Sequence, residues 1–146
     1  MNNEDKELLE YLYKSSEMGR DSLTNLLKEL KDKENKLKGL ISDELSEYEK
    51  FFNKSKKLLK KHKSEITSNS LITKIMSKQG IKKEVSNDNS DASIAHMLIE
   101  GLTMGVVDIE TKINNFKDKS DKSILKLCEK YLKFQKEEIE KLKKYL

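Results

Sequence analysis

The sequence predicts an all-α fold, a bundle of four long helices, and three observations lead to this class. The 146 residues contain no proline and only five glycines. Leucine, lysine and glutamate dominate, and such straight-chain side chains lose little rotamer freedom in a helix. Apolar residues recur at helical spacing along most of the chain. A chain of this length corresponds to one domain, which we expect to span residues 1–146.

The composition also narrows the class of protein. Charged residues make up 38% of the chain, but 30 basic and 26 acidic groups leave a net charge of only +4, which does not indicate nucleic-acid binding. The single cysteine, Cys128, cannot form an intramolecular disulfide and indicates a reducing compartment. The acidic start lacks the apolar core of a signal peptide, and no apolar run reaches the roughly 20 residues that cross a bilayer. We therefore expect a cytoplasmic protein without a transmembrane segment.

The first hairpin is predicted from residues 4–31 and 35–63. The first helix can be capped by Asn2 or Asn3. Its predicted inward face is Leu8, Leu12, Ser15, Ser16, Gly19, Leu23, Leu26 and Leu30. That of the second helix is Leu37, Ile41, Glu44, Leu45, Tyr48, Phe52, Ser55 and Leu59. The charged segment between the two helices, residues 31–36, is predicted to form a tight turn. The seven-residue spacing of Leu30 and Leu37 also allows one continuous helix, which would need a coiled-coil partner.

Residues 64–90 are predicted to form a crossover that packs on the bundle. Serine, asparagine and aspartate accumulate here, and a short helix is expected over residues 70–78, with Gly80 just past its end. Its cap would be Ser68 or Asn69. The apolar residues that it could bury are Ile66, Leu71, Ile72, Ile75, Met76 and Ile81.

The second hairpin is predicted from helices over residues 91–117 and 121–145, with Ser90 or Asp91 capping the first of them. The inward face of the third helix is predicted to be Ala95, Leu98, Leu102, Gly105, Val106, Ile109, Ile113 and Phe116. That of the fourth is Ile124, Cys128, Tyr131, Leu132, Gln135, Ile139, Leu142 and Leu146. Two short turns around one long crossover make each hairpin antiparallel and helices two and three parallel.

This layout resembles the ferritin-like four-helix-bundle superfamily over essentially the whole chain. More locally, three segments are similar to a group of uncharacterised small bacterial proteins, namely residues 13–19, 93–109 and 134–143. The resemblance implies the fold and assigns no activity. The superfamily's di-iron site needs Glu-x-x-His on two helices. Neither His62 nor His96 completes that motif, so we expect no cofactor, with iron or manganese as the alternative.

Several polar residues fall on inward faces. Glu44, Tyr48, Gln135 and Glu138 are candidates for a small polar or metal pocket, and the alternative is a hydrogen-bonded layer that fixes helix register. Counting from the helix ends places four residues at about the same position along the bundle axis, namely Ser22, Glu44, Leu102 and Gln135. His96 and Glu100 are an (i, i+4) pair that could bind a metal ion with help from a second chain, or else form an exposed surface contact.

The third helix is apolar beyond its inward face. Ile94, Met97, Gly101, Met104 and Val107 are candidates for a self-association surface, and the alternative is that the crossover covers them. The most basic stretch consists of Lys54, Lys56, Lys57, Lys60, Lys61, His62 and Lys63. It could meet phosphates, but a solvated helix end is the preferred interpretation. Nucleic-acid binding is not expected.

No sequence motif indicates catalysis, since the chain has no glycine-rich phosphate loop, nucleophile elbow or zinc-ligand spacing. The leading hypothesis is a non-catalytic helical scaffold or protein-interaction module that self-associates through helix three and has an unknown protein partner. The alternative is a divergent ferritin-like protein that binds a metal or a small ligand around Glu44.

Overall fold

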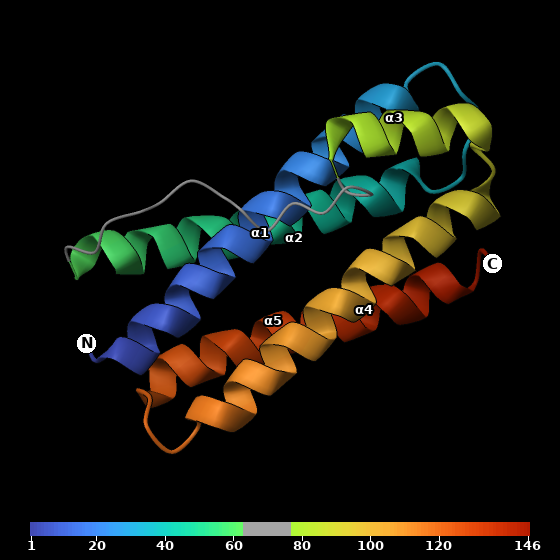
Figure 1. The fold of residues 1–146 in the computed structure, drawn as a ribbon. Helices are drawn as coiled ribbons and strands as arrows, with labels where there is room; N and C mark the ends of the chain where they lie inside the picture. The colour runs from blue at the N-terminus through green and yellow to red at the C-terminus, as the bar shows by residue number, and fades with distance from the viewer. Residues whose placement is uncertain (63–76) are drawn as a thin grey trace.

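The computed structural model describes residues 1–62 and 77–146, and these residues form helices without strands. The helices are α1 (Asn3–Glu29), α2 (Lys38–Lys61), α3 (Lys78–Asn87), α4 (Asp91–Phe116) and α5 (Lys122–Lys143). The predicted all-α class is confirmed. Figure 1 shows two long hairpins, α1 with α2 and α4 with α5, laid against each other, with the shorter α3 beside the C-terminal half of α1.

Hydrogen bonds at the two ends of the molecule fix the direction of the long helices. At one end, the Asn2 side chain donates to the Lys119 carbonyl at 2.6 Å, and the Asp121 amide donates to the Asp5 carboxylate at 2.8 Å. The starts of α1 and α5 therefore lie together. At the other end, the Lys36 amide donates to Asp91 at 2.8 Å, so α2 and α4 also start together. Thus α1 runs parallel to α5, and α2 runs parallel to α4.

Each long helix except α2 begins at a side-chain cap that the sequence supplies. Asn2 and Asp5 form a capping box at α1, in which the Asn2 side chain accepts from the Asp5 amide at 2.8 Å. Ser90 caps α4 and Asp121 caps α5. Such caps satisfy backbone N–H groups that have no partner within the helix.

The first two helices are separate, so the alternative of one continuous helix is wrong. Helix α1 ends at Glu29, and the Asn35 side chain accepts from the Leu37 amide at 2.8 Å while donating to the Asn89 carbonyl at 3.0 Å. This local bond turns the backbone before α2. The turn is possible without glycine or proline because an asparagine side chain replaces a backbone partner.

The described part of the crossover contains a short helix, α3, that was not predicted. It begins at Lys78, where the expected helix over residues 70–78 ended, and that expected helix lies almost entirely outside the described residues. The Ser77 side chain accepts from the Gly80 amide at 3.1 Å, which puts Gly80 in the first turn rather than past the end. Ile81 and Val85, one turn apart, are both buried and give the helix its apolar face.

The hydrophobic core is one continuous cluster that runs between the two hairpins and under α3. The predicted inward faces supply most of it. Leu146 is an exception, since it lies beyond the end of α5 and is 62% exposed. Among the larger fully buried side chains are Tyr131, Leu8, Leu12, Leu26, Ile41 and Leu59.

Helix α4 is long and apolar enough to cross a membrane, and it is the only helix in the described residues that is. The sequence was expected to contain no such run. Its most apolar window has a mean hydropathy of 1.4, and 33% of that window is buried in the fold. Core helices of soluble proteins meet the same criterion, and α4 contributes Leu98, Leu102 and Ile109 to the core.

Candidate functional site

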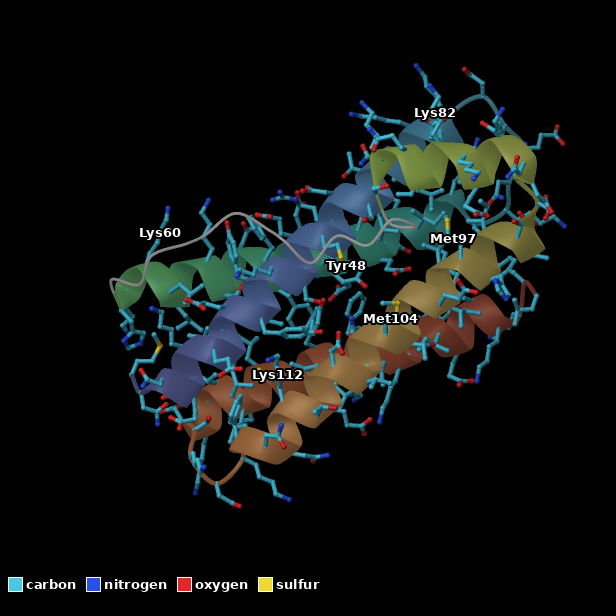
Figure 2. All side chains as sticks on the ribbon, in the orientation of Figure 1. Tyr48, Lys60, Lys82, Met97, Met104 and Lys112 are labelled. Carbon is cyan, nitrogen blue, oxygen red and sulfur yellow. The ribbon has the colours of Figure 1, made fainter. Side chains whose placement is uncertain are left out.

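A cavity of about 80 Å³ lies at mid-height between the two hairpins. All four long helices contribute to its wall, which is mostly apolar. Figure 2 shows Tyr48 and Met104 at this place, between the front helices α1 and α4. The wall residues are Tyr11, Ser15, Met18, Gly19, Leu23, Glu44, Tyr48, Leu98, Gly101, Leu102, Met104, Gly105, Asp108 and Gln135. Three of the four residues predicted to share one height are among them.

Two helical glycines make room for the polar side chains of this wall. A Cβ atom placed on Gly19 would lie 2.5 Å from the Tyr48 ring, and one on Gly105 would collide with the Gln135 amide. Any larger residue would therefore have to displace these groups. The close approach of α1 to Tyr48 and of α4 to Gln135 depends on the absence of a side chain at both positions.

Glu44 is the most unusual group in the cavity wall. Its side chain, on α2, is only 1% exposed, and its Oε2 atom has no hydrogen-bond partner. Burial, and next the neighbouring Glu138 carboxylate, raise the pKa of Glu44 to about 8, while Lys141 acts in the opposite direction. A carboxyl in such surroundings favours its neutral, protonated form at neutral pH.

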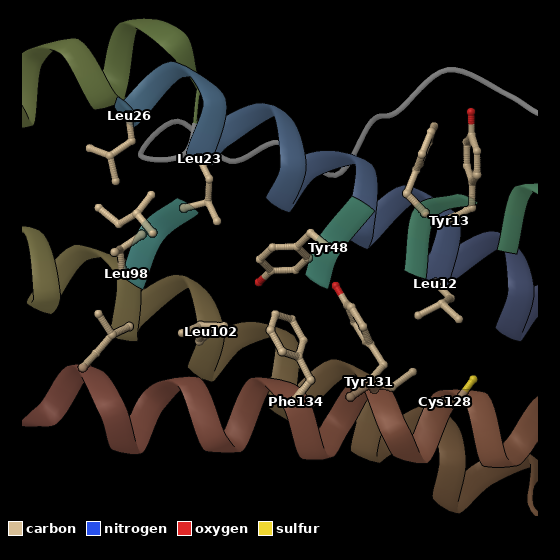
Figure 3. Close-up of a cluster of buried hydrophobic side chains, with 14 of the residues drawn as sticks. Leu12, Tyr13, Leu23, Leu26, Tyr48, Leu98, Leu102, Cys128, Tyr131 and Phe134 are labelled. Carbon is tan, nitrogen blue, oxygen red and sulfur yellow. The ribbon is translucent and has the colours of Figure 1, made fainter. Parts of the chain in front are cut away.

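Gln135 and Tyr48 complete the polar part of the wall. The Gln135 side chain, 2% exposed, lies near the Tyr48 hydroxyl, and its Oε1 atom has no hydrogen-bond partner. Burial raises the pKa of Tyr48 far above its ordinary value, so its hydroxyl stays protonated. The Tyr48 ring is held edge-on against Phe134 at a centroid distance of 5.1 Å. Figure 3 shows Tyr48, Phe134 and Tyr131 gathered together, with the Leu23 side chain above them and Leu102 to one side.

A chain of hydroxyl groups leads from the core to the mouth of the cavity. Tyr131, fully buried, shares a 2.6 Å hydrogen bond with Ser15 across the hairpin interface. The Tyr11 hydroxyl lies near Ser15 and near the Asp108 carboxylate on α4. Burial first, and the Asp108 charge second, raise the pKa of Tyr11. Polar groups therefore extend from the buried Tyr131 phenol to the exposed Asp108 carboxylate.

Glu138 lies next to Glu44 but outside the cavity wall. Its side chain is buried, and its Oε1 atom bonds the Lys141 ammonium at 3.1 Å, leaving Oε2 without a partner. Burial raises the pKa of Glu138, an effect that the Lys141 bond opposes. Within residues 1–62 and 77–146, no three His, Cys, Asp or Glu side chains come close enough to hold a metal ion.

His96 and Glu100 contact each other on the outer surface of α4. Their side chains are 69% and 51% exposed, and His96 Nδ1 lies 3.2 Å from Glu100 Oε1. Neither belongs to the cavity wall. The pair is a contact between neighbouring surface residues one helical turn apart.

The proposed self-association face divides into a buried and an exposed part. Ile94 and Met97 are 1% and 5% exposed, so their assignment to an outer surface is wrong. Both belong to the continuous hydrophobic core. Met104 and Val107, by contrast, are 53% and 57% exposed, and Gly101 lines the cavity.

The lysine-rich stretch ends α2, with Lys60 and Lys61 in its last turn. Cations stabilise the negative end of a helix dipole. The ammonium group of Lys56 lies 5.6 Å from the centre of the Phe52 ring. Figure 2 shows Lys60 pointing away from the bundle. Lys63 lies outside the described residues.

Cys128 is fully buried on α5, and burial raises the pKa of its thiol to about 12. A thiol that stays protonated is a poor nucleophile and a poor metal ligand. Cys128 is therefore a packing residue.

Part of the wall was not singled out from the sequence. Tyr11, Met18 and Asp108 lie to the side of the predicted inward faces. A signal for them exists: Tyr11, Ser15 and Met18 share one face of α1 at spacings of four and three, as do Gly101, Gly105 and Asp108 on α4. The two glycines on the α4 face leave room opposite Ser15 on α1, which is the signal for a gap between the two helices.

Comparison with known protein families, with curated proteins and with solved structures finds no match to this chain. The geometry of the cavity therefore carries the functional interpretation.

Proposed function

We propose that this protein binds a small molecule in the cavity between its two hairpins. The observation that supports this most directly is the presence of two buried, unpaired polar atoms in the wall, Glu44 Oε2 and Gln135 Oε1. Buried polar groups in folded proteins nearly always have partners. Both atoms belong to residues that line the cavity, and a mostly apolar cavity with a few converging polar groups is the usual form of a ligand site.

The alternative, a layer of hydrogen bonds that fixes helix register, accounts for less of the geometry. Such a layer stabilises a unique packing when every member is paired, and a half-paired network is costly. Ser15 and Tyr131 fit that description, because they bond each other at 2.6 Å. Glu44 does not, since its burial raises its pKa to about 8 and leaves one oxygen without a partner.

We also propose that the arrangement of the helices is that of a ferritin-like bundle. The parallel pairs α1 with α5 and α2 with α4, set by the contacts of Asp5 and Asp91, support this layout. The ligand would then sit where such bundles build their sites, on inward side chains of facing helices. In the described residues no three His, Cys, Asp or Glu side chains lie close enough together to hold a metal ion, so a small organic ligand is the preferred occupant.

Binding can be tested with the methionine methyl groups as reporters. Met18 and Met104 line the cavity, whereas Met97 is buried elsewhere on α4. We expect fragments of a mixed set of small cations, anions and neutral molecules to shift the Met18 and Met104 methyl resonances, with Met97 unchanged. A Leu102→Phe variant, which fills the cavity, should abolish the shifts while its circular dichroism stays helical. The proposal fails if no fragment of any class perturbs the two lining methyl groups.

A second candidate function is self-association through the exposed part of α4. Met104 and Val107 are exposed, and residues 101–107 carry no charged side chain. Exposed apolar residues on an uncharged stretch favour pairing with a second copy. Sedimentation over a concentration series should show a dimer that Val107→Lys dissociates, whereas Thr111→Lys, one turn away, leaves it intact. A monomer at every concentration would exclude this function.

A further inference from the structure

The unpaired atoms of the cavity wall specify what a ligand must offer. Among the described residues, the buried atoms of wall residues without a partner are Glu44 Oε2 and Gln135 Oε1. Gln135 Oε1 accepts hydrogen bonds, and Glu44 Oε2 does so when its carboxyl is ionised. The Gln135 amide nitrogen faces Gly105. A ligand that pairs both atoms while Glu44 is ionised must donate hydrogen bonds, which a carboxylate or a phosphate dianion cannot do.

The cavity wall contains acidic side chains and no basic ones. Glu44 and Asp108 are its acidic residues, and the wall contains no lysine, arginine or histidine. Lys141 is the cation that lowers the pKa of Glu44, but its Nζ atom pairs with Glu138 Oε1 at 3.1 Å. A cation in the cavity would supply the missing countercharge, and such an attraction is stronger in a buried site than in water.

The rest of the wall suits an alkyl chain attached to a cation. The rings of Tyr11 and Tyr48 and the thioethers of Met18 and Met104 present apolar and polarisable surfaces. The cavity volume of about 80 Å³ is roughly half that of an apolar protein cavity of about 150 Å³ that binds benzene. It therefore accommodates an ammonium head with a few carbon atoms rather than an aromatic ring system.

A longer ligand has a path out of the cavity. A groove of about 490 Å³ between α1 and α4 shares Tyr11 and Asp108 with the cavity wall. The Asp108 carboxylate is exposed at this junction. A second positive group on the ligand would meet it there.

We propose that the ligand is an aliphatic ammonium ion whose N–H groups bind Glu44 Oε2 and Gln135 Oε1, with its alkyl chain between Tyr48 and Met104. In a linear diamine the second ammonium group binds Asp108. This inference rests on the proposed small-molecule function and narrows it to a ligand class.

Binding of such a cation is coupled to loss of a proton from Glu44. In the empty site the pKa of Glu44 is about 8, so the carboxyl is mostly neutral at pH 7 and must ionise to pair with the ammonium group. Below pH 8 the affinity should rise up to about tenfold for each pH unit. The other ionisable groups around the site are Tyr11, Tyr48, Asp108, Tyr131, Glu138 and Lys141.

The test uses three probes that share one chain length and differ in charge: butylammonium, butanol and butyrate. We expect calorimetry at pH 7.5 to give butylammonium at least about tenfold tighter binding than butanol, with no binding of butyrate. The Glu44→Gln variant should lose at least about tenfold for butylammonium and keep its affinity for butanol. Diaminobutane should bind more tightly than butylammonium, an advantage that Asp108→Asn removes.

The outcomes separate this inference from the proposed function. Equal binding of butanol and butylammonium, or unchanged ammonium affinity in Glu44→Gln, overturns the ammonium assignment and leaves a small-molecule site. Binding of Mn²⁺ that depends on Glu44, with no ammonium binding, overturns it in favour of a metal. If none of the probes and none of the fragments shifts the Met18 and Met104 methyl groups, both proposals fail. The comparison among probes uses the unmodified protein, so it does not depend on the folding of a variant.

Discussion

Replacement of Glu44 by glutamine is expected to remove most of the dependence of stability on pH between pH 5 and pH 9. The pKa of Glu44 is raised from 4.5 to about 8 by burial and by Glu138. Between these values the native state holds a proton that the unfolded chain has released. The free energy of unfolding therefore falls as the pH rises from about 4.5 and levels off above about pH 8.

The size of this effect follows from the shift. The rise in the pKa of Glu44 corresponds to a loss of unfolding free energy on the order of 3–5 kcal/mol in the wild-type protein as the pH rises from 5 to 9. This loss is a large part of the stability of a small domain. The Glu44→Gln variant has no proton to lose, so it should match the wild type near pH 5 and exceed it near pH 9. Glu138, whose pKa is also raised, leaves a smaller slope of the same sign.

Urea unfolding followed by circular dichroism at a series of pH values measures this difference. Glu49→Gln is the matched control, because Glu49 lies on the same helix with an exposed side chain and loses the same charge. Its curve should run parallel to that of the wild type. If the Glu44→Gln curve is also parallel, Glu44 is not a buried neutral carboxyl, and the physical basis of the cavity proposal is removed.

Replacement of Gly19 by alanine is expected to destabilise the fold by about 1–3 kcal/mol, although alanine is the better helix former. The new Cβ would lie 2.5 Å from the Tyr48 ring. That ring cannot yield freely, because it is 6% exposed and packs against Phe134 at 5.1 Å and Tyr131 at 6.1 Å. The helices α1 and α2 would have to separate, or the ring would have to enter the cavity.

Two other glycines of the long helices, Gly39 and Gly105, give an internal scale for this result. Gly39 has open space around its Cβ position, so Gly39→Ala should leave stability unchanged or raise it by up to about 1 kcal/mol. The stability of Gly105→Ala should fall between those of the other two variants. Its new Cβ meets the Gln135 amide, which is the end of a flexible side chain and can turn into the cavity. Thermal unfolding of the three variants tests the order. If Gly19→Ala is as stable as Gly39→Ala, the close contact with Tyr48 does not exist in solution.

Much of the site could be predicted from helical periodicity. Glu44, Tyr48, Gln135 and Glu138 were expected to face inward, and all four are buried. The reason is that a helix turns by about 100° per residue, so the apolar residues on either side of each polar one define its direction. Composition alone was enough for the all-α class, because a chain without proline and rich in leucine, lysine and glutamate has little alternative to helix.

Periodicity could not decide how far apart the facing helices lie. A helical wheel places a residue relative to its own axis, whereas a cavity depends on the residues of two or more helices at the same height. The opening beside Met18, Met104 and Asp108 arises where α1 and α4 face each other with small or polar residues. For the same reason the pairing of Ser15 with Tyr131, 116 positions apart, could not be predicted.

The sequence by itself determined the four long helices, most of their inward faces and the presence of a carboxyl group in the core. Only the tertiary structure decided that this carboxyl lacks a partner, that Ile94 and Met97 are covered while Met104 and Val107 are not, and that Gly19 lies against Tyr48. Helix formation depends on neighbours within one turn, which the sequence displays directly. Burial and hydrogen-bond pairing depend on which residues of other helices come within a few ångströms, and these are set by the packing of the whole bundle.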